Sequence, residues 1–286
     1  MSKHPRTRKN IRAKRIESIK HLFMAIVVAL VMYPFAMLVI LSFKDNNQFF
    51  NEPWVLTFPL HLKNYAAAFL ALLRYVGNSF LISGASCCGV VLVSAFSAYV
   101  FARFRFPGRE FLFLAIISLM MIPGVLGLVP RFVIIKRLGL IDTYWALILP
   151  YIAIGQVMGI FLLRTFFESI PGDLFDAARI DGAGDFRSFS SVAVPLCKPT
   201  MATVAIITVQ FTWNDLIWPL VVISDDKLKP LTIGLLTFQS QFSTYSMTRW
   251  GPLFAGYVVA SLPLLALFMV ASRTFVRGLT TGALKA

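Results

Sequence analysis

Six long blocks of apolar residues, separated by shorter polar segments, dominate the 286-residue chain. Each block approaches the roughly 20 mostly apolar residues that an α-helix needs to cross about 30 Å of hydrocarbon. The pattern therefore predicts an all-α, polytopic membrane protein with six transmembrane helices. The predicted spans are residues 22–43, 79–101, 111–131, 143–163, 199–223 and 252–272.

The polar segments suggest how the chain is organised around these spans. We predict a basic N-terminal segment (1–21), a six-helix transmembrane domain (22–272) and a C-terminal tail (273–286), with one dense polar loop at 164–198. The first span is longer than the core of a signal peptide and no clear cleavage site follows it. We therefore expect it to remain as an anchor.

Composition agrees with a membrane protein. Hydrophobic residues make up 58% of the chain and charged residues 14%, whereas soluble domains are about half apolar and about a quarter charged. The formal net charge of +14 would suit nucleic acid, but eight of the 27 Lys and Arg residues lie among the first twenty residues. The others lie between apolar blocks, which favours the lipid bilayer as a partner over nucleic acid.

The distribution of Lys and Arg also predicts an orientation. If the N-terminus is inside the cell, the interior segments carry eighteen of these residues and the exterior segments nine. Cytoplasmic segments of membrane proteins hold the excess of positive charge. We therefore predict that both termini are cytoplasmic. The polar segment with the amphipathic stretch Tyr65–Tyr75, and the long connection Ser224–Gly251, would then lie outside.

The segment from Arg164 to Pro199 combines charges with helical apolar spacing. Pro171 and Asp173 are typical of a helix start, and Gly182 releases the backbone where that helix would end. A second amphipathic stretch follows, which we expect to end at Pro195. The segment is therefore either a helix-turn-helix that docks a partner or a solvated connection between two spans. The face made by steps of three and four residues comprises Leu174, Ala177, Ala178 and Asp181.

This segment resembles the EAA loop of ABC importer permeases, the binding-protein-dependent inner-membrane components. The likeness rests on the run from Asp176 to Ala183, on Phe186 and Phe189, and on the Pro-Leu-x-x-Pro ending at Pro195–Pro199. Asp176 stands where the family usually has Glu, which keeps the charge but shortens its reach.

Further runs resemble the carbohydrate branch of these permeases, similar to the second membrane subunit of the maltose importer, and extend the likeness over nearly the whole chain after about residue 15. They are Asn64-Tyr65, Asn78-Ser79, Ala98-Tyr99, Ala102–Gly108 (ARFRFPG), Trp213–Leu220 (WNDLIWPL) and Val276–Ala286 (VRGLTTGALKA).

The resemblance implies a type I ABC importer permease fold in a bacterial or archaeal cell (inner) membrane. It implies a sugar importer in which this chain and a second permease, favoured to be a different chain, form the pathway. ABC ATPase subunits and an extracytoplasmic solute-binding protein would be the other partners. The implied ATPase-coupling residues are Asp176, Ala177, Ala178, Arg179, Asp181, Gly182, Ala183 and Phe186. The implied tail contacts with the ATPase are Gly278, Thr281, Gly282 and Lys285.

The sequence lacks the chemistry of an enzyme. No G-x-x-x-x-G-K-[ST] run is present, so we expect ATP and Mg to be bound by the partner ATPase subunits and this chain to carry no cofactor. His4, His21 and His61 are scattered, which gives no metal site. A membrane enzyme of the CDP-alcohol phosphotransferase class is also disfavoured. That class has Asp-Gly before Ala-Arg and adds later paired aspartates for metal. In this chain Ala178-Arg179 precedes Asp181-Gly182, and the later aspartates are missing.

A stand-alone secondary transporter or channel for a small polar solute is the alternative, because such proteins place ionisable groups in their pathway. The fifth predicted span carries one acid, Asp215, close to the polar side chains of Gln210 and Asn214. Asp215 could equally cap or pair locally, with Trp213 an aromatic of the membrane interface, and both interpretations stay open. The candidate pathway residues are Gln156, Gln210, Trp213, Asn214 and Asp215.

Overall fold

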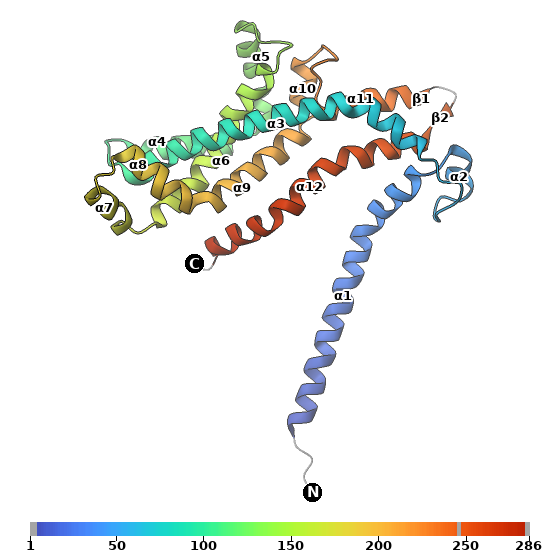
Figure 1. Cartoon of the computed structure of the whole chain (residues 1–286), viewed down its shortest axis with the longest axis horizontal. Coiled ribbons are helices and arrows are strands. Elements are labelled where there is room, and N and C mark those ends of the chain that lie inside the picture. The colour runs from blue at the N-terminus through green and yellow to red at the C-terminus, as the bar shows by residue number, and fades with distance from the viewer. Residues whose placement is uncertain (1–4, 245–246, 284–286) are drawn as a thin grey trace. The chain divides into compact units, whose positions relative to one another are not determined.

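A computed structural model describes residues 5–244 and 247–283 of the chain. They fall into two compact units, one built from 1–70 with 239–259 and the other from 71–238 with 260–286. Figure 1 shows the elements in chain order. The first unit contains α1 (Pro5–Ser42), α2 (Asn46–Asn51), the start of α3 (Lys63–Arg103), the end of α11 (Leu231–Phe242), the antiparallel pair β1 (Ser243–Thr244) and β2 (Met247–Thr248), and the start of α12 (Trp250–Ala283).

The second unit contains the remainder of α3, α11 and α12 together with every element between α3 and α11. These are α4 (Arg109–Ser118), the 3₁₀ turns η1 (Leu119–Met121) and η2 (Gly124–Gly127), α5 (Leu128–Arg137), α6 (Trp145–Ser169), α7 (Asp173–Ile180), α8 (Asp185–Ser188), the π-helical turn η3 (Phe189–Ala193), α9 (Val194–Asn214) and α10 (Ile217–Val222).

The predicted all-α, polytopic architecture is confirmed. Among the described residues, five helices are long and apolar enough to cross a membrane, and a bent pair of helices supplies a sixth span if it counts as one. The bent pair is the third predicted span. Many large apolar side chains on these helices are exposed in the isolated chain, which suits helices that face lipid or a partner.

A buried lysine organises the first unit. Lys44 follows α1 and is 1% exposed, and its Nζ donates to the carbonyl oxygens of Glu52 and Val55, both at 2.6 Å. A third bond reaches Thr57 Oγ1 at 3.1 Å. Because a buried ammonium is costly unless its donors are satisfied, these three acceptors hold the loop after α2 around the lysine. The amide of Asn64 donates to the carbonyl oxygen of Lys44 at 2.9 Å and so joins α3 to the end of α1.

Small residues let α3, α6 and α9 approach closely in the second unit (Figure 1). A Cβ added to Gly159 of α6 would collide with Ser94 of α3 and would lie 3.3 Å from Val204 of α9. Ser94 Oγ donates to the carbonyl oxygen of Gln156 at 3.4 Å. Membrane helices associate through such small residues, since lipid offers no hydrophobic driving force between them.

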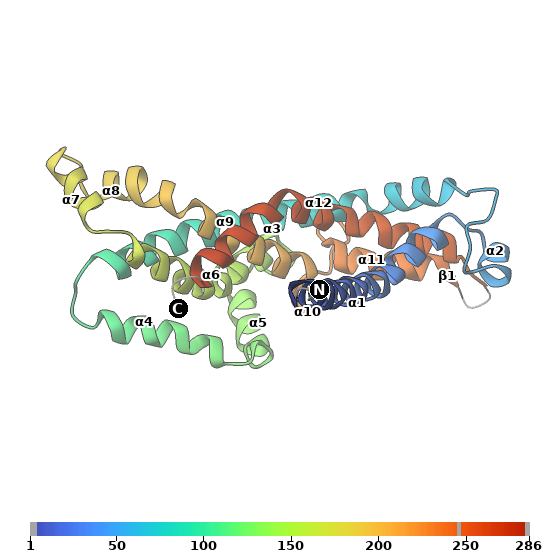
Figure 2. The same ribbon diagram turned by 90° about the horizontal axis from the view of Figure 1, so that it is seen from below.

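The predicted third span, 111–131, is not one straight helix. The chain from Arg109 to Met121 and the chain from Gly124 to Arg137 meet at an angle of 100°, and Figure 2 shows the turn between α4 and α5. Pro123 lies at the break. It lacks a backbone N–H and drives Ile122 out of the helical region, to ψ 119°.

Two further boundaries differ from the prediction. The fifth span was expected over 199–223, but α9 ends at Asn214 because the carboxylate of Asp215 accepts backbone N–H groups ahead of α10. The expectation that the second amphipathic stretch ends at Pro195 is wrong, since helical structure continues from Asp185 to Asn214. Pro195 lies inside this continuous helical segment, directly after the π-helical turn η3, and such a turn changes the local hydrogen-bond pattern of a helix.

The segments predicted to lie outside the membrane also contain regular structure. The stretch Tyr65–Tyr75 is continuous with the second span in the 41-residue helix α3, because no proline interrupts it. The connection Ser224–Gly251 contains α11. The side-chain amide of Asn78 fixes the part of this connection that precedes α11, because it donates to the carbonyl oxygens of Lys227 and Lys229 at 2.8 and 2.9 Å.

Candidate functional site

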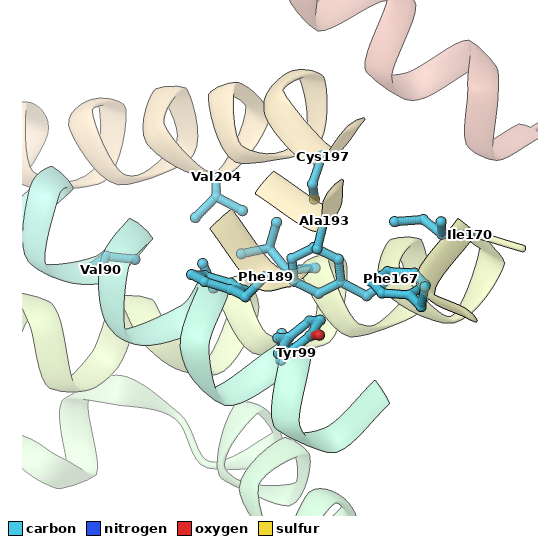
Figure 3. Packing of buried hydrophobic residues seen from close by; sticks show 12 residues of the cluster. Val90, Tyr99, Phe167, Ile170, Phe189, Ala193, Cys197 and Val204 are labelled. Atoms are coloured by element: carbon cyan, nitrogen blue, oxygen red, sulfur yellow. The ribbon is translucent and has the colours of Figure 1, made fainter. Parts of the chain in front are cut away.

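The polar loop at 164–198 forms α7, a tight turn and α8, and one aromatic side chain anchors it to the spans. Phe175 of α7 is 6% exposed and belongs to a buried cluster with Tyr99 of α3, Phe167 of α6 and Phe189 of η3. Figure 3 shows the last three side chains pointing toward one another. The ring centres of Tyr99 and Phe189 are 5.1 Å apart. α7 is thus packed onto the ends of three transmembrane elements rather than suspended in solvent.

Arg103, the last residue of α3, joins the same elements through polar contacts. Its Nη2 donates to the carbonyl oxygens of Phe167 and Ile170, both at 2.6 Å, and so satisfies backbone groups where α6 ends. Its guanidinium carbon lies 4.0 Å from the ring centre of Phe175. The sequence places Arg103 among the basic residues between spans and in the run Ala102–Gly108, but it predicts no contact between Arg103 and α7. No pattern along the sequence pairs Arg103 with Phe175, because the contact joins residues that are 72 positions apart.

A buried arginine also ties α4 to α6 at the same end of the unit. Arg164 is 6% exposed, and its Nη2 lies 2.7 Å from Glu110 Oε1 while its Nε lies 2.8 Å from Glu168 Oε1. Its guanidinium carbon also lies 3.7 Å from the ring centre of Phe113. Charge-assisted bonds of this kind are stronger than neutral ones and hold the helix ends in one arrangement.

Gly182 makes the turn between α7 and α8. It has a φ of +79°, in the left-handed region that favours glycine. Its N–H donates to the carbonyl oxygen of Arg179 at 3.0 Å, and the N–H of Ala183 donates to that of Ala178 at 2.9 Å. This pair of bonds is the Schellman arrangement that ends a helix at a left-handed residue. The glycine therefore sets the direction in which α8 leaves α7.

The predicted coupling residues lie together on this helix-turn-helix, and most of them face solvent. Asp176, Ala177, Arg179, Asp181, Gly182 and Phe186 are exposed, and Ala178 and Ala183 are half-buried. Ile180, which sequence reasoning did not select, is 87% exposed. The guanidinium of Arg179 lies 3.9 Å from carboxylate oxygens of Asp176 and Asp185. We call the exposed set Leu174, Asp176, Ala177, Ile180, Asp181, Gly182 and Phe186 the coupling surface.

The predicted tail contacts lie apart from this surface in the sequence. Gly278, Thr281 and Gly282 belong to the last turns of α12, whereas Lys285 lies outside the described residues.

The candidate pathway residues do not form one cluster. Trp213 is buried against Phe80, with their ring centres 5.1 Å apart, and Asn214 donates to the carbonyl oxygen of Gln210 at 2.8 Å. Gln156 lies half-buried on α6.

Asp215 is held by three protein donors. Its Oδ2 accepts from Tyr151 Oη at 2.9 Å, and its Oδ1 accepts from the backbone N–H groups of Ile217 at 3.1 Å and Trp218 at 3.4 Å. A carboxylate that accepts N–H groups at a helix start stabilises that start. Asp215 therefore begins α10 and connects it to α6.

A cavity of about 730 Å³ opens beside Asp215. It lies in the angle between α4 and α5, the bent pair that we call the broken span. Its lining comes from the α4–α5 bend, from α6 between Ala153 and Met158, from Phe211 of α9 and from the start of α10. Its lining is mainly apolar, with Asp215 and Arg131 as the charged members. Gln156, Gln210, Trp213 and Asn214 are not among the residues that line it.

Within the part of the chain that the structure describes, no group of three or more His, Cys, Asp or Glu side chains is placed to hold a metal ion. The described residues thus present an exposed helix pair that packs against the end of α6, and a separate cavity beside the middle of α6 and the end of α9.

Comparison with known proteins agrees with this arrangement. Residues 90–281 match the family described as "Binding-protein-dependent transport system inner membrane component". The chain is similar to the probable ABC transporter permease protein YurM of Bacillus subtilis, at 33% identity over 92% of this chain and 87% of the relative. It is also similar to the diacetylchitobiose uptake system permease protein NgcG of Streptomyces coelicolor, at 32% identity over 95% of this chain and 90% of the relative.

A third relative is the sn-glycerol-3-phosphate transport system permease protein UgpE of Brucella abortus, 33% identical over 91% of this chain and 95% of its own length. Among solved structures, a bacterial ABC transporter that imports the acidic polysaccharide alginate has a similar fold, with a TM-score of 0.83, 20% identity, and coverage of 92% of this chain and 98% of that chain. The chain thus belongs to the family of binding-protein-dependent transport system inner-membrane components, the permeases of ABC importers.

Proposed function

We propose that the chain is a permease subunit of an ATP-driven, binding-protein-dependent sugar importer. In this proposal it forms half of the translocation pathway, with a second permease of different sequence as the other half. The names of two relatives, which refer to diacetylchitobiose and to sn-glycerol 3-phosphate, support a small polyhydroxylated solute. The alginate importer with a similar fold has also been solved with a periplasmic protein bound to an alginate pentasaccharide, which supports an external binding protein as a partner.

The observation that carries the proposal is the coupling surface on α7 and α8. It exposes apolar side chains, such as Ile180, that water does not favour and that suit a protein partner. Phe175 and Arg103 attach the same helix to α3 and α6. A push on α7 from an ATPase would therefore reach the spans directly, and residues Asp176–Gly182 form the element that transmits it.

The proposal assigns ATP and Mg to partner ATPase subunits, since the chain has no Walker A run. It also places the coupling surface and both termini in the cytoplasm, which the excess of Lys and Arg in those segments supports. The connection Ser224–Gly251 would then face the binding protein, and the end of α12 would reach the ATPase as a second contact.

Purification of the tagged chain in detergent, followed by mass spectrometry of the proteins that accompany it, tests the proposal. We expect a P-loop ATPase and a second six-span chain, with the ATPase reduced when Asp176 or Gly182 is replaced. As a matched control, Asp173→Asn changes an exposed acid of the same helix outside the coupling surface. A chain that purifies alone and moves solute into liposomes without ATP would contradict the proposal and favour a secondary transporter.

A further inference from the structure

The cavity in the angle of the broken span contains an arginine whose hydrogen-bonding groups have no protein partner. Arg131 of α5 lines the cavity, and its guanidinium carbon lies 4.2 Å from the ring centre of Trp218. Its Nε is buried and makes no hydrogen bond. Over residues 5–244 and 247–283, no hydrogen bond or ion pair joins its guanidinium to a protein oxygen. Stacking on Trp218 fixes the plane of the group while leaving its donors without acceptors.

The nearby carboxylate does not neutralise this arginine by direct contact. Both oxygens of Asp215 already accept bonds, one from Tyr151 and the other from the start of α10. Asp215 is therefore satisfied by the protein, and Arg131 is the group in the cavity that still needs acceptors. A guanidinium in a mainly apolar pocket of a membrane protein is costly, and such residues mark solute or ion pathways.

The rest of the lining adds a flat apolar surface. Phe211 of α9 is 48% exposed and lines the same cavity as Arg131, together with Met120 and Met158. A volume of about 730 Å³ is in the range of small-molecule sites. A ligand that fits this lining would have oxygen acceptors for Arg131 on one side and C–H groups for Phe211 on another. A sugar ring has both.

We propose that this cavity is a binding station for a polyhydroxylated solute, in which Arg131 donates to solute oxygens and Phe211 packs against the apolar face of the solute. The proposal rests on the proposed importer function and names where this chain contacts its cargo. The station is separate from the coupling surface. Met158 lies eleven residues before the end of α6 at Ser169, which corresponds to about 16 Å along the helix.

The test uses the complete transporter in liposomes, with ATP inside and the binding protein outside. Labelled disaccharides, N-acetylated disaccharides and sn-glycerol 3-phosphate serve as probes, and the one that the wild-type complex takes up fastest is then followed. The measured quantity is the number of solute molecules moved per ATP hydrolysed. If the wild-type complex takes up none of them in an ATP-dependent way, the importer function fails and this inference fails with it.

Given wild-type uptake, we expect Arg131→Gln to lower the solute moved per ATP at least tenfold while ATP hydrolysis stimulated by the binding protein stays within twofold. Arg131→Lys keeps the charge without the planar donors and should lose less. Arg137→Gln, an exposed arginine of the same helix, is the control and should stay within twofold. An unchanged ratio in Arg131→Gln would overturn the station while leaving the importer function intact.

If the transporter with Arg131→Gln does not assemble, a second variant tests the binding station. Phe211→Leu removes the ring and keeps an apolar side chain, and we expect at least a fivefold loss of solute moved per ATP. Phe161→Leu on α6, an exposed phenylalanine outside the cavity, is its control. A wild-type ratio in Phe211→Leu, or cross-linking of a photoreactive residue at position 211 to the second permease alone and never to the solute probe, would overturn the station.

Discussion

The guanidinium carbon of Arg103 lies 4.0 Å from the ring centre of Phe175, and this contact joins the last residue of α3 to the first turn of α7. The same guanidinium donates two hydrogen bonds to the end of α6. Three elements thus meet at one side chain. A displacement of α7 must either move the ends of α3 and α6 with it or break these contacts, so the joint has the rigidity that coupling to a transmembrane pathway requires.

Removal of this joint should uncouple the transporter. Arg103→Ala loses two charge-assisted bonds and one stacking contact, which together contribute on the order of 2 kcal/mol or more. We expect the stimulation of ATP hydrolysis by the liganded binding protein to fall about tenfold while the basal rate persists. Arg105→Ala, an exposed arginine two residues away, is the control, and an equal loss in that variant would contradict a specific role for Arg103.

The turn at Gly182 should tolerate no branched side chain. A residue with a Cβ costs roughly 1–2 kcal/mol in the left-handed region, so Gly182→Val should redirect α8 and lower transport at least fivefold without preventing membrane insertion. Gly184→Val is the matched control, because Gly184 has a φ of −71° and a ψ of 173°, which suit valine. A Cβ at either position meets open space. Normal transport by Gly182→Val would show that the turn does not control coupling.

The close approach of α3 and α6 predicts a stability difference between two glycines. Gly159→Ala places a methyl group against Ser94 and should destabilise the protein by about 1–3 kcal/mol, as overpacking does. Gly84→Ala lies on α3, where the added methyl meets nothing within 4 Å, and should be neutral or stabilising. Thermal unfolding in detergent measures both changes. A lower midpoint for Gly84→Ala than for Gly159→Ala would contradict the packing described for α3 and α6.

The stability of the turn between α5 and α6 should depend on pH, because the carboxylate of Asp142 binds the connection after α10. Backbone N–H groups of Asp225 and then Ser224 donate to its carboxylate and lower the pKa of Asp142. Its pKa in the folded protein is below its value in the unfolded chain. The contribution to stability is therefore fully present above the ordinary pKa of an aspartate and is lost as the pH falls through the folded pKa.

Limited proteolysis of the connection 224–229 at pH 7 and at acidic pH measures this effect. Wild-type protein should become more sensitive to the protease on acidification, whereas Asp142→Asn should be sensitive at both pH values. Asparagine tolerates the φ of 57° at this position, so the substitution isolates the charge. Asp226→Asn, in the same connection, is the control and should keep the wild-type pH dependence. A pH-independent wild type would show that the carboxylate does not hold this turn.

The sequence predicts the spans well because they depend on a long-range average of hydropathy. It predicts interruptions poorly, because they depend on single side chains. Pro123 and Asp215 each break a span, yet Pro150 and Pro199 lie inside helices that continue. Whether a proline breaks a helix depends on the residues that pack around it, which periodicity does not contain.

The candidate site likewise contains features that the sequence predicts and others that depend on contacts between distant residues. The position of Gly182 could be predicted from the sequence, since a left-handed turn after an amphipathic helix calls for glycine. Phe175 and Arg103 could not, because their roles depend on a contact between residues 72 positions apart. The cavity around Arg131 follows from the bend at Pro123, which no span-level pattern shows.

The proposed function requires the coupling surface to contact the ATPase. Site-specific photo-cross-linking in the complete transporter tests this contact, with a photoreactive residue at Ile180 in one sample and at Leu126, an equally apolar exposed site in the bend of the broken span, in another. We predict that position 180 cross-links to the ATPase with a yield that changes when ATP is added, and that position 126 does not. Absence of the ATPase from the products at position 180, with the ATPase captured at position 126, would show that the coupling surface does not dock on the ATPase.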